Sequence, residues 1–158
     1  LIEVLRERGH AVVAEAATDV IARRQAAGLT EDDDTFLHEI LELQLERERA
    51  AVADVVFFDR SPLCTLALAN YLDRPVTRAL RSAADRSAAI YQREVFLVRP
   101  LGFVRRTAAR RISYADSLRF AAIHEQVYRS HGFTLVDVPK AAPGERVALL
   151  EGRTSAPG

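Results

Sequence analysis

The sequence of 158 residues lacks methionine and tryptophan and has one cysteine and one lysine. The single cysteine, Cys64, excludes an internal disulfide framework and is typical of a reducing compartment. No apolar run approaches the ~20 residues of a membrane span, and the charged N-terminus has no signal-peptide core. These absences predict a soluble, cytoplasmic protein that binds no membrane. The missing initiator methionine predicts a processed, truncated or partially read chain.

The sequence also has no excess of charge of either sign, because 22 acidic residues balance 22 basic ones. This balance argues against binding to nucleic acid through bulk positive potential. The only lysine is Lys140, so the other basic residues are all arginine. The length suits one domain, and 49% hydrophobic residues suffice for a packed core. We expect one domain over residues 1–150 and a disordered tail over residues 151–158, and the oligomeric state stays open.

Short apolar runs alternate with stretches of helical periodicity along the whole chain. Strands are expected at residues 11–14, 55–58, 94–98 and 133–138. Helices are expected before Gly9, at residues 16–27, 35–51, 62–72, 76–90 and 115–131, and from Pro143 onward. This alternation predicts an α/β fold whose parallel sheet is flanked by helices joined through right-handed crossovers.

Polar residues directly follow the expected strands, where ligands of open parallel sheets bind. Asp59 follows the second strand and can hold Mg²⁺ or take a proton from a hydroxyl, or it can cap the helix that starts at Pro62. Arg60 can bind a phosphate or carboxylate with its planar fork, or form a surface ion pair. Glu15 follows the first strand as a general base or as a helix N-terminal charge. An acid, an acid–arginine pair and an arginine cluster are therefore expected at one sheet edge.

The arginine cluster lies in a segment without acidic residues, between Glu94 and Asp116. Guanidinium groups crowded without counter-charge repel each other unless water or an anion lies near them. Phosphate suits such a cluster, because arginine binds it bidentately. The alternative is a solvated loop in a protein that uses arginine in place of lysine. The members are Arg99, Arg105, Arg106, Arg110 and Arg111.

Histidine and cysteine give no sign of a metal site. None of the four histidines is spaced with a second metal ligand, which argues against zinc. Cys64 has no histidine near it in the sequence, and we interpret it as a packed thiol. The acidic run at residues 31–34 is interpreted as a helix-start charge.

Four segments, the last of which contains the whole final strand, together resemble a known family. They are AVVAEAATDVIARRQ, VVFFDRSPLCTLALA, TAARRISYADSLRFAAIHEQVY and GFTLVDVP. Over residues 1–150 the chain resembles the NadR-type AAA-domain family, P-loop NTPases similar to the kinase domain that phosphorylates nicotinamide riboside. The resemblance implies a P-loop-kinase-like fold, ATP and Mg²⁺ as cofactors, and a nucleotide and a small nucleoside-like acceptor as partners.

The resemblance also implies roles for the strand-end residues and for part of the arginine cluster. Glu15 matches an acid near the acceptor hydroxyl, Asp59 an acid near Mg²⁺ or the acceptor, and Arg60 an arginine that contacts substrate. Arg110 and Arg111, with Arg106, match the lid that closes over the nucleotide phosphates. Such residues suit phosphoryl transfer, which needs positioning, Mg²⁺ and positive charge. Whether Glu15 or Asp59 is the base stays open.

One departure from the family pattern is large. The family begins with a strand and a phosphate-binding (Walker A) loop, G-x-x-x-x-G-K-[ST], which this sequence does not contain. The opening LIEVLRERGH resembles the helix that follows that loop. We expect the first strand, which is central in such folds, to be missing between residues 55–58 and 94–98. Unpaired buried backbone groups cost ~1–3 kcal/mol each, so we expect a poorly stable chain.

Three interpretations therefore stay open. The full-length protein is an ATP-dependent small-molecule kinase or NTPase, inactive as the chain stands here. Alternatively, the chain is a non-catalytic module on a degenerate P-loop fold that binds phosphate, another anion or a protein partner. The third is a partial gene product without activity.

Overall fold

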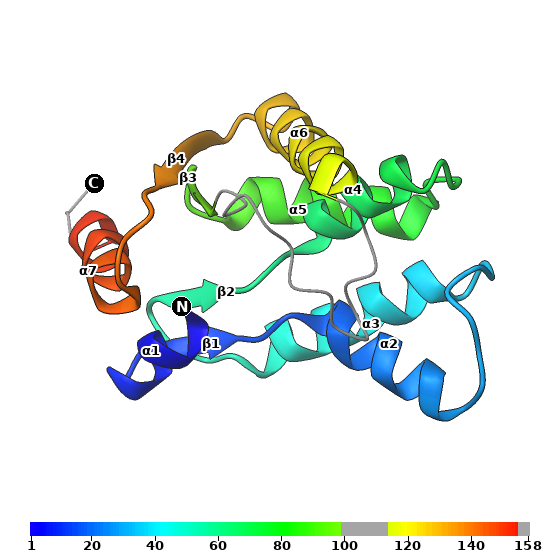
Figure 1. The fold of residues 1–158 in the computed structure, drawn as a ribbon, viewed down its shortest axis with the longest axis horizontal. Coiled ribbons are helices and arrows are strands. Elements are labelled where there is room, and N and C mark those ends of the chain that lie inside the picture. The colour runs from blue at the N-terminus through cyan, green and yellow to red at the C-terminus, as the bar shows by residue number, and fades with distance from the viewer. Residues whose placement is uncertain (99–113, 155–158) are drawn as a thin grey trace.

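The computed structural model describes residues 1–98 and 114–154, and these form seven helices and four strands (Figure 1). The strands are β1 (Ala11–Val13), β2 (Val56–Phe58), β3 (Glu94–Val98) and β4 (Thr134–Val138). The helices are α1 (Ile2–Glu7), α2 (Ala16–Ala26), α3 (Phe36–Ala50), α4 (Pro62–Tyr71), α5 (Arg78–Ile90), α6 (Tyr114–Ser130) and α7 (Pro143–Thr154). Each expected element is present, with bounds that differ by one or two residues at most ends.

All strand pairing in the described part of the chain is parallel, which confirms the predicted α/β class. β1 pairs with β2, with Val13 opposite Phe58, and β3 pairs with β4, with Val98 opposite Val138. The strands form two separate two-stranded sheets, and β2 and β3 are not hydrogen-bonded neighbours. The layer is therefore interrupted between β2 and β3, where the sequence predicts a missing central strand.

The two sheets nevertheless share one hydrophobic cluster. Phe57 of β2 and Val138 of β4 are buried together with Leu5 of α1 and Val147 of α7, and Phe96 of β3 packs against them. Figure 1 shows α1 and α7 at the end of the molecule that carries both sheets. The core thus spans the interruption. The predicted low stability of the chain stays a prediction.

The largest core lies between α4, α5 and α6. Helix α4 is mostly apolar, and Leu63, Ala67 and Ala69 on it are fully buried. Asn70 near its end is exposed, so the helix is buried over most of its surface but not all of it. Small residues on α5, Ala83 and Ala84, complete the contact with it. Ser61 precedes α4 in an extended conformation and Pro62 occupies its first turn, a position that tolerates proline.

The C-terminal boundary needs a correction. Residues 151–154 belong to α7, so the expected disordered tail does not begin at residue 151. Glu151 holds this turn, because it accepts a hydrogen bond from Arg8 at 2.6 Å and lies 2.9 Å from His10 Nε2. Arg153 also pairs with Glu94 at 2.8 Å. These contacts join α7 to α1 and β3.

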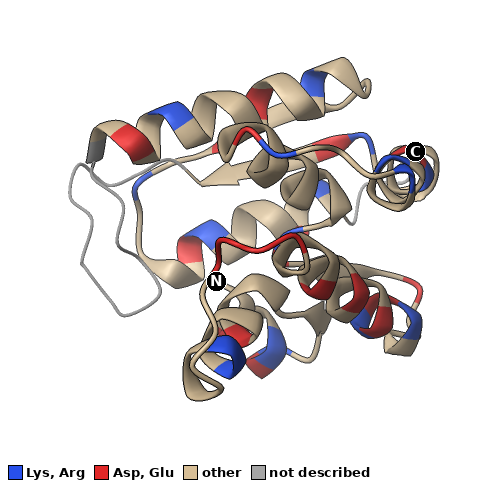
Figure 2. Ribbon diagram, turned by 90° about the vertical axis from the view of Figure 1, so that its right-hand side faces the viewer, with Lys and Arg blue, Asp and Glu red and all other residues tan. Residues whose placement is uncertain are grey.

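Charged residues are spread over the helices. Figure 2 shows acidic and basic positions interspersed along several of them. Among the described helices, none combines the length and the apolar composition that crossing a bilayer requires.

Candidate functional site

The candidate site lies at the carboxyl ends of β1 and β2. The backbone N–H of Asp59 donates to the Val13 carbonyl at 2.8 Å, so the parallel pairing extends one residue past β2. This register brings the residues that follow the two strands together. Arg60 Nε lies 3.4 Å from Glu15 Oε1, an ion pair between residues 45 positions apart in the sequence. The predicted convergence of Glu15 and Arg60 at one sheet edge is present in the structure.

The backbone of Arg60 adopts a left-handed conformation with φ of +80°. This conformation costs a non-glycine residue on the order of 1–3 kcal/mol and is concentrated at functional sites. The buried side-chain amide of Gln44 on α3 reaches the Arg60 carbonyl at 3.5 Å. The tight turn lets α4 start directly after β2 while the Arg60 side chain lies across the end of β1.

Groups that carry negative charge surround the Arg60 guanidinium. Burial opposes its charge, but the neighbouring Cys64, Glu15 and Asp59 together raise the pKa of Arg60. The side chain is still 42% exposed, so solvent screens these interactions. A guanidinium is charged at physiological pH in any case. Arg60 is therefore a permanent cation that solvent and a bound anion can both reach.

Glu15 is oriented by two further groups. The Thr18 hydroxyl donates to Glu15 Oε2 at 2.7 Å, from the first turn of α2. Arg47 on α3 donates to the backbone carbonyls of Ala14 and Glu15, at 3.0 and 2.6 Å, and pairs with Asp19. Arg47 thus anchors the segment between β1 and α2. Sequence analysis missed this residue, because its partners lie more than 25 positions away.

Only part of the predicted site lies in the described residues. Glu15, Asp59 and Arg60 are adjacent at the sheet edge, and the Asp59 side chain interacts with its surroundings. Arg106, Arg110 and Arg111, together with Arg99 and Arg105, lie outside the described residues. Over residues 1–98 and 114–154 no group of three or more His, Cys, Asp or Glu side chains is placed to hold a metal.

A histidine on α6 joins the edge of this site. Arg60 Nη1 lies 3.5 Å from His124 Nε2, and His124 is buried. The contact connects the end of β2 with a helix 64 positions later in the chain. No spacing rule predicts it, since α6 reaches this place only through the packing of its apolar face on α4.

Comparison with known proteins identifies the family. A profile described as AAA domain matches residues 1–146. The chain belongs to the AAA domain family. No curated protein and no solved structure matches the sequence. Family membership makes this AAA domain a P-loop NTPase-type domain, as the sequence resemblance implies.

The sequence of this AAA domain departs from the P-loop pattern at the phosphate-binding loop. No G-x-x-x-x-G-K-[ST] motif occurs in the 158 residues, and Lys140, which follows β4, has no glycine-rich loop before it. The described residues therefore do not supply a backbone cradle for a triphosphate. They supply Glu15, the neighbouring Asp59 and Arg60, and the interrupted sheet beside these residues.

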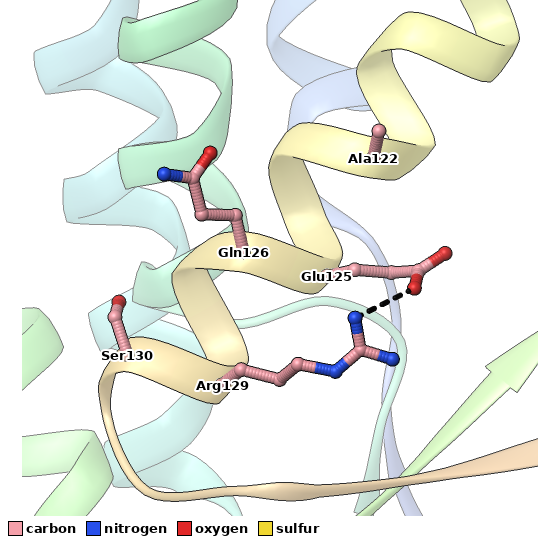
Figure 3. Close-up of a pocket in the computed structure, with 5 residues that line it drawn as sticks. All are labelled: Ala122, Glu125, Gln126, Arg129 and Ser130. Carbon is pink, nitrogen blue, oxygen red and sulfur yellow. Dashed lines mark ion pairs between the residues drawn. The ribbon is translucent and has the colours of Figure 1, made fainter.

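Two hollows on the described part of this AAA domain lie elsewhere. One lies against α6 alone, with Glu125 paired to Arg129 at 3.2 Å beside it (Figure 3). Another lies between the start of α3 and the turn before α5, lined by His38 and Arg74 among others. Neither is lined by Glu15, Asp59 or Arg60. We place the candidate site at the strand ends, because parallel sheets bind ligands there and the charged groups converge there.

Proposed function

We propose that this AAA domain serves ATP-dependent phosphoryl transfer to a hydroxyl of a small, nucleoside-like acceptor. The observation that carries the proposal is the ion pair between Arg60 Nε and Glu15 Oε1 at 3.4 Å, directly beside Asp59 at the ends of two parallel strands. Phosphoryl transfer depends on positioning and on compensation of charge. A carboxylate for the hydroxyl proton, a carboxylate for Mg²⁺ and a cation for the substrate are the groups it uses.

The donor set at the strand ends fits magnesium. Mg²⁺ in kinases is usually held by one or two carboxylates, with waters and substrate phosphates as its other ligands. A group of three protein ligands is therefore not required. Asp59 would hold the ion through water, and the bound ion would neutralise charge on the transferred group.

Glu15 and Arg60 then act on the acceptor. Glu15 takes the proton from the attacking hydroxyl, and the Thr18 hydroxyl and Arg60 hold its carboxylate in place from two sides. Arg60 is exposed enough to bind an anionic group of the acceptor or product with its remaining donors. The lid role of Arg106, Arg110 and Arg111 is part of the same proposal.

The triphosphate requires a further segment. We propose that a strand and loop with the G-x-x-x-x-G-K-[ST] pattern pair between β2 and β3 and complete the sheet. Support comes from the two strand edges that lack a partner there within the described residues, and from the shared cluster of Phe57 and Phe96. Residues 1–158 alone are then expected to show no ATP turnover.

Turnover measurements test both parts of the proposal. The chain alone is assayed for Mg-ATP hydrolysis and for phosphate transfer to ribonucleosides, and the same is done after fusion of a strand and phosphate-binding loop to its N-terminus. Only the fusion is expected to be active. In the fusion, Asp59→Asn and Glu15→Gln are each expected to lower kcat by roughly 10²–10⁴-fold without a change in Tm.

Asp54→Asn is the matched control. Asp54 is an exposed acid that precedes β2, at the opposite end of the strand from Asp59, and its loss should leave kcat unchanged. Full activity of the Asp59→Asn fusion would disprove the magnesium role. Robust turnover by residues 1–158 alone would disprove the need for the added loop.

The missing motif favours a second candidate, a non-catalytic anion-binding module. In that case both proteins lack turnover, yet AMP binds to residues 1–158 and Arg60→Ala abolishes binding. Calorimetric titration with AMP separates this function from the kinase.

A further inference from the structure

Arg47 on α3 makes three contacts that phosphoryl transfer as proposed above does not use directly. Its Nη1 donates to the Ala14 carbonyl at 3.0 Å and to the Glu15 carbonyl at 2.6 Å, and its Nη2 pairs with Asp19. Both carbonyls lie past the last residue of β1, and Asp19 lies in the first turn of α2. Arg47 therefore fixes the backbone at the point where β1 turns into α2.

The same face of α3 also reaches the turn after β2. Gln44 precedes Arg47 by three positions, so the two side chains leave α3 on one side. Gln44 is buried, and its Nε2 lies 3.5 Å from the Arg60 carbonyl. The backbone of Arg60 has φ of +80°, a conformation that persists only where the surroundings hold it. One helix thus contacts the two turns that carry Glu15 and Arg60.

A further contact connects α3 with the end of β2 itself. The Tyr91 hydroxyl donates to the Glu48 carboxylate, and the Tyr91 ring stacks on Phe58 with 5.1 Å between the ring centroids. Phe58 is the last residue of β2 and immediately precedes Asp59. Glu48 follows Gln44 by four positions, so it lies on the side of α3 that faces the strand ends. Helix α3 is therefore connected to the ends of both strands.

Helix α3 is held in turn by two parts of the core. Ile40 and Leu43 are buried with Val20 of α2 in one cluster, and Leu41 belongs to the cluster between α4, α5 and α6. Close packing on two sides leaves a helix little freedom to shift. The side chains that α3 extends to the strand ends therefore start from a fixed backbone.

The ion pair between Glu15 and Arg60 does not fix its own geometry. The two side chains are 28% and 42% exposed, and Arg60 Nε lies 3.4 Å from Glu15 Oε1. Ion pairs that solvent reaches to this extent contribute little to the free energy of folding. The backbone segments that carry the two side chains set their separation, and these are the segments that α3 contacts.

We propose that Arg47 is a positioning residue of the candidate site, which sets the Glu15 carboxylate against Arg60 by fixing the turn after β1 to α3. Its effect on catalysis rests on the proposed phosphoryl transfer, in which Glu15 takes the proton of the acceptor hydroxyl. A planar guanidinium reaches two carbonyls and a carboxylate at once, and the compact ammonium group of lysine does not reproduce this geometry. Arg47→Lys therefore keeps the charge and removes the fork.

NMR of the Arg60 side chain tests the positioning in residues 1–158, without any turnover. The Nε–H signal of Arg60 is identified by its loss in Arg60→Lys, and Glu15→Gln gives its position without the ion pair. Arg47→Lys is expected to move the signal toward that position. Arg49→Lys is the matched control, because Arg49 is an exposed arginine on the same helix. An Arg60 signal that Arg47→Lys leaves unchanged would overturn the proposal.

The unaltered chain decides if Arg47→Lys does not fold. A guanidinium held by three acceptors rotates slowly about its Nε–Cζ bond, so Arg47 is expected to show two resolved Nη signals at low temperature. Arg49, which is exposed, is expected to show one averaged signal under the same conditions. An averaged signal for Arg47 would mean that its fork is not held, and the proposal would fail.

Turnover of the fusion described above tests the effect on catalysis. Arg47→Lys is expected to lower kcat roughly tenfold, because a small misplacement of a catalytic group is costly, while the KM for Mg-ATP stays unchanged. In the Glu15→Gln fusion, Arg47→Lys is expected to lower kcat no further, because it acts through Glu15. An equal fold-loss in both backgrounds, which a merely structural role would give, would refute positioning through Glu15.

The two measurements distinguish the role of Arg47 from the proposed function. A shifted Arg60 signal together with an inactive fusion would support the positioning of Glu15 and refute phosphoryl transfer. An active fusion in which Arg47→Lys changes neither kcat nor the Arg60 signal would support phosphoryl transfer and refute the positioning role.

Discussion

Two arginines of this AAA domain contrast in how completely their charges are satisfied. Arg24 on α2 is 2% exposed and donates to the Thr30 carbonyl twice, at 2.6 and 2.8 Å, and to the Thr35 hydroxyl at 3.0 Å. It also pairs with Asp33 and Glu39. Arg60 is 42% exposed, with one ion pair at 3.4 Å and a 3.5 Å contact to His124.

The difference supports a structural role for Arg24 and the proposed binding role for Arg60. Every donor of Arg24 that the geometry offers is used, and the Phe36 ring lies 5.8 Å from its guanidinium carbon. Arg24 therefore fixes the acidic turn before α3 and has nothing left for a ligand. Arg60 keeps donors in reach of solvent on a strained backbone. Strain of this kind is often found at functional sites, which supports the proposed binding role of Arg60.

Removal of Arg24 is expected to have the largest effect on stability. Arg24→Leu leaves the Thr30 carbonyl and two carboxylates without their cation. We expect a loss of about 3 kcal/mol in the free energy of unfolding, at the lower end for a broken buried charge pair because the carboxylates are 40–46% exposed. The urea midpoint measures it. Arg23→Leu, the exposed neighbour on α2, should change stability by less than about 0.5 kcal/mol, and similar losses in both variants would contradict a special role for Arg24.

The fold was largely predictable because strands and helices alternate with clear boundaries. Gly9 and Gly28 follow the first two helices with positive φ, as expected for residues that end a helix. The interruption between β2 and β3 was predictable only through the family resemblance, since hydrophobic periodicity does not give strand order. The end of α7 was misplaced, because the partners of Glu151 lie more than 140 positions away.

The candidate site was predictable at its strand ends and not beyond. Glu15 and Arg60 follow strands that pair in parallel, so topology alone brings them together. Cys64 packs against the core between α4, α5 and α6, as interpreted from the sequence. His124 lies 64 positions beyond Arg60 and approaches it only through helix packing. Contacts of this kind need coordinates.

A backbone test sharpens the contrast between the two arginines. Arg60→Gly and Arg60→Ala both remove the guanidinium, but only glycine adopts φ of +80° without strain. We expect the glycine variant to be more stable than the alanine variant by about 1 kcal/mol. At Arg24, inside α2, the order should reverse by a similar amount, because glycine destabilises a helix interior. Thermal unfolding of the four variants measures both differences, and the same order at both positions would show that Arg60 is not strained.

The acid dependence of stability is expected to show the smallest effect, at Asp33. Its carboxylate accepts from the Thr35 hydroxyl at 2.7 Å and the Thr35 N–H at 2.9 Å. These hydrogen bonds and the Arg24 charge, against the opposing effect of burial, lower the pKa of Asp33 below its ordinary 3.8. A lowered pKa in the folded state stabilises the fold above pH 3.8, and this stabilisation is lost as the pH falls below that value.

Urea midpoints at pH 6, 4 and 3 measure the Asp33 contribution. Asp33→Asn should lower the midpoint at pH 6 and flatten the decline below pH 4. Asp32→Asn is the control, because Asp32 is 92% exposed and its ion pair with Arg74 is long, at 4.0 Å. An unchanged acid decline in the Asp33 variant would mean that the acidic turn is held by Arg24 alone. The contrast between Arg24 and Arg60 would then depend on the Arg24 guanidinium and not on the carboxylates that it binds.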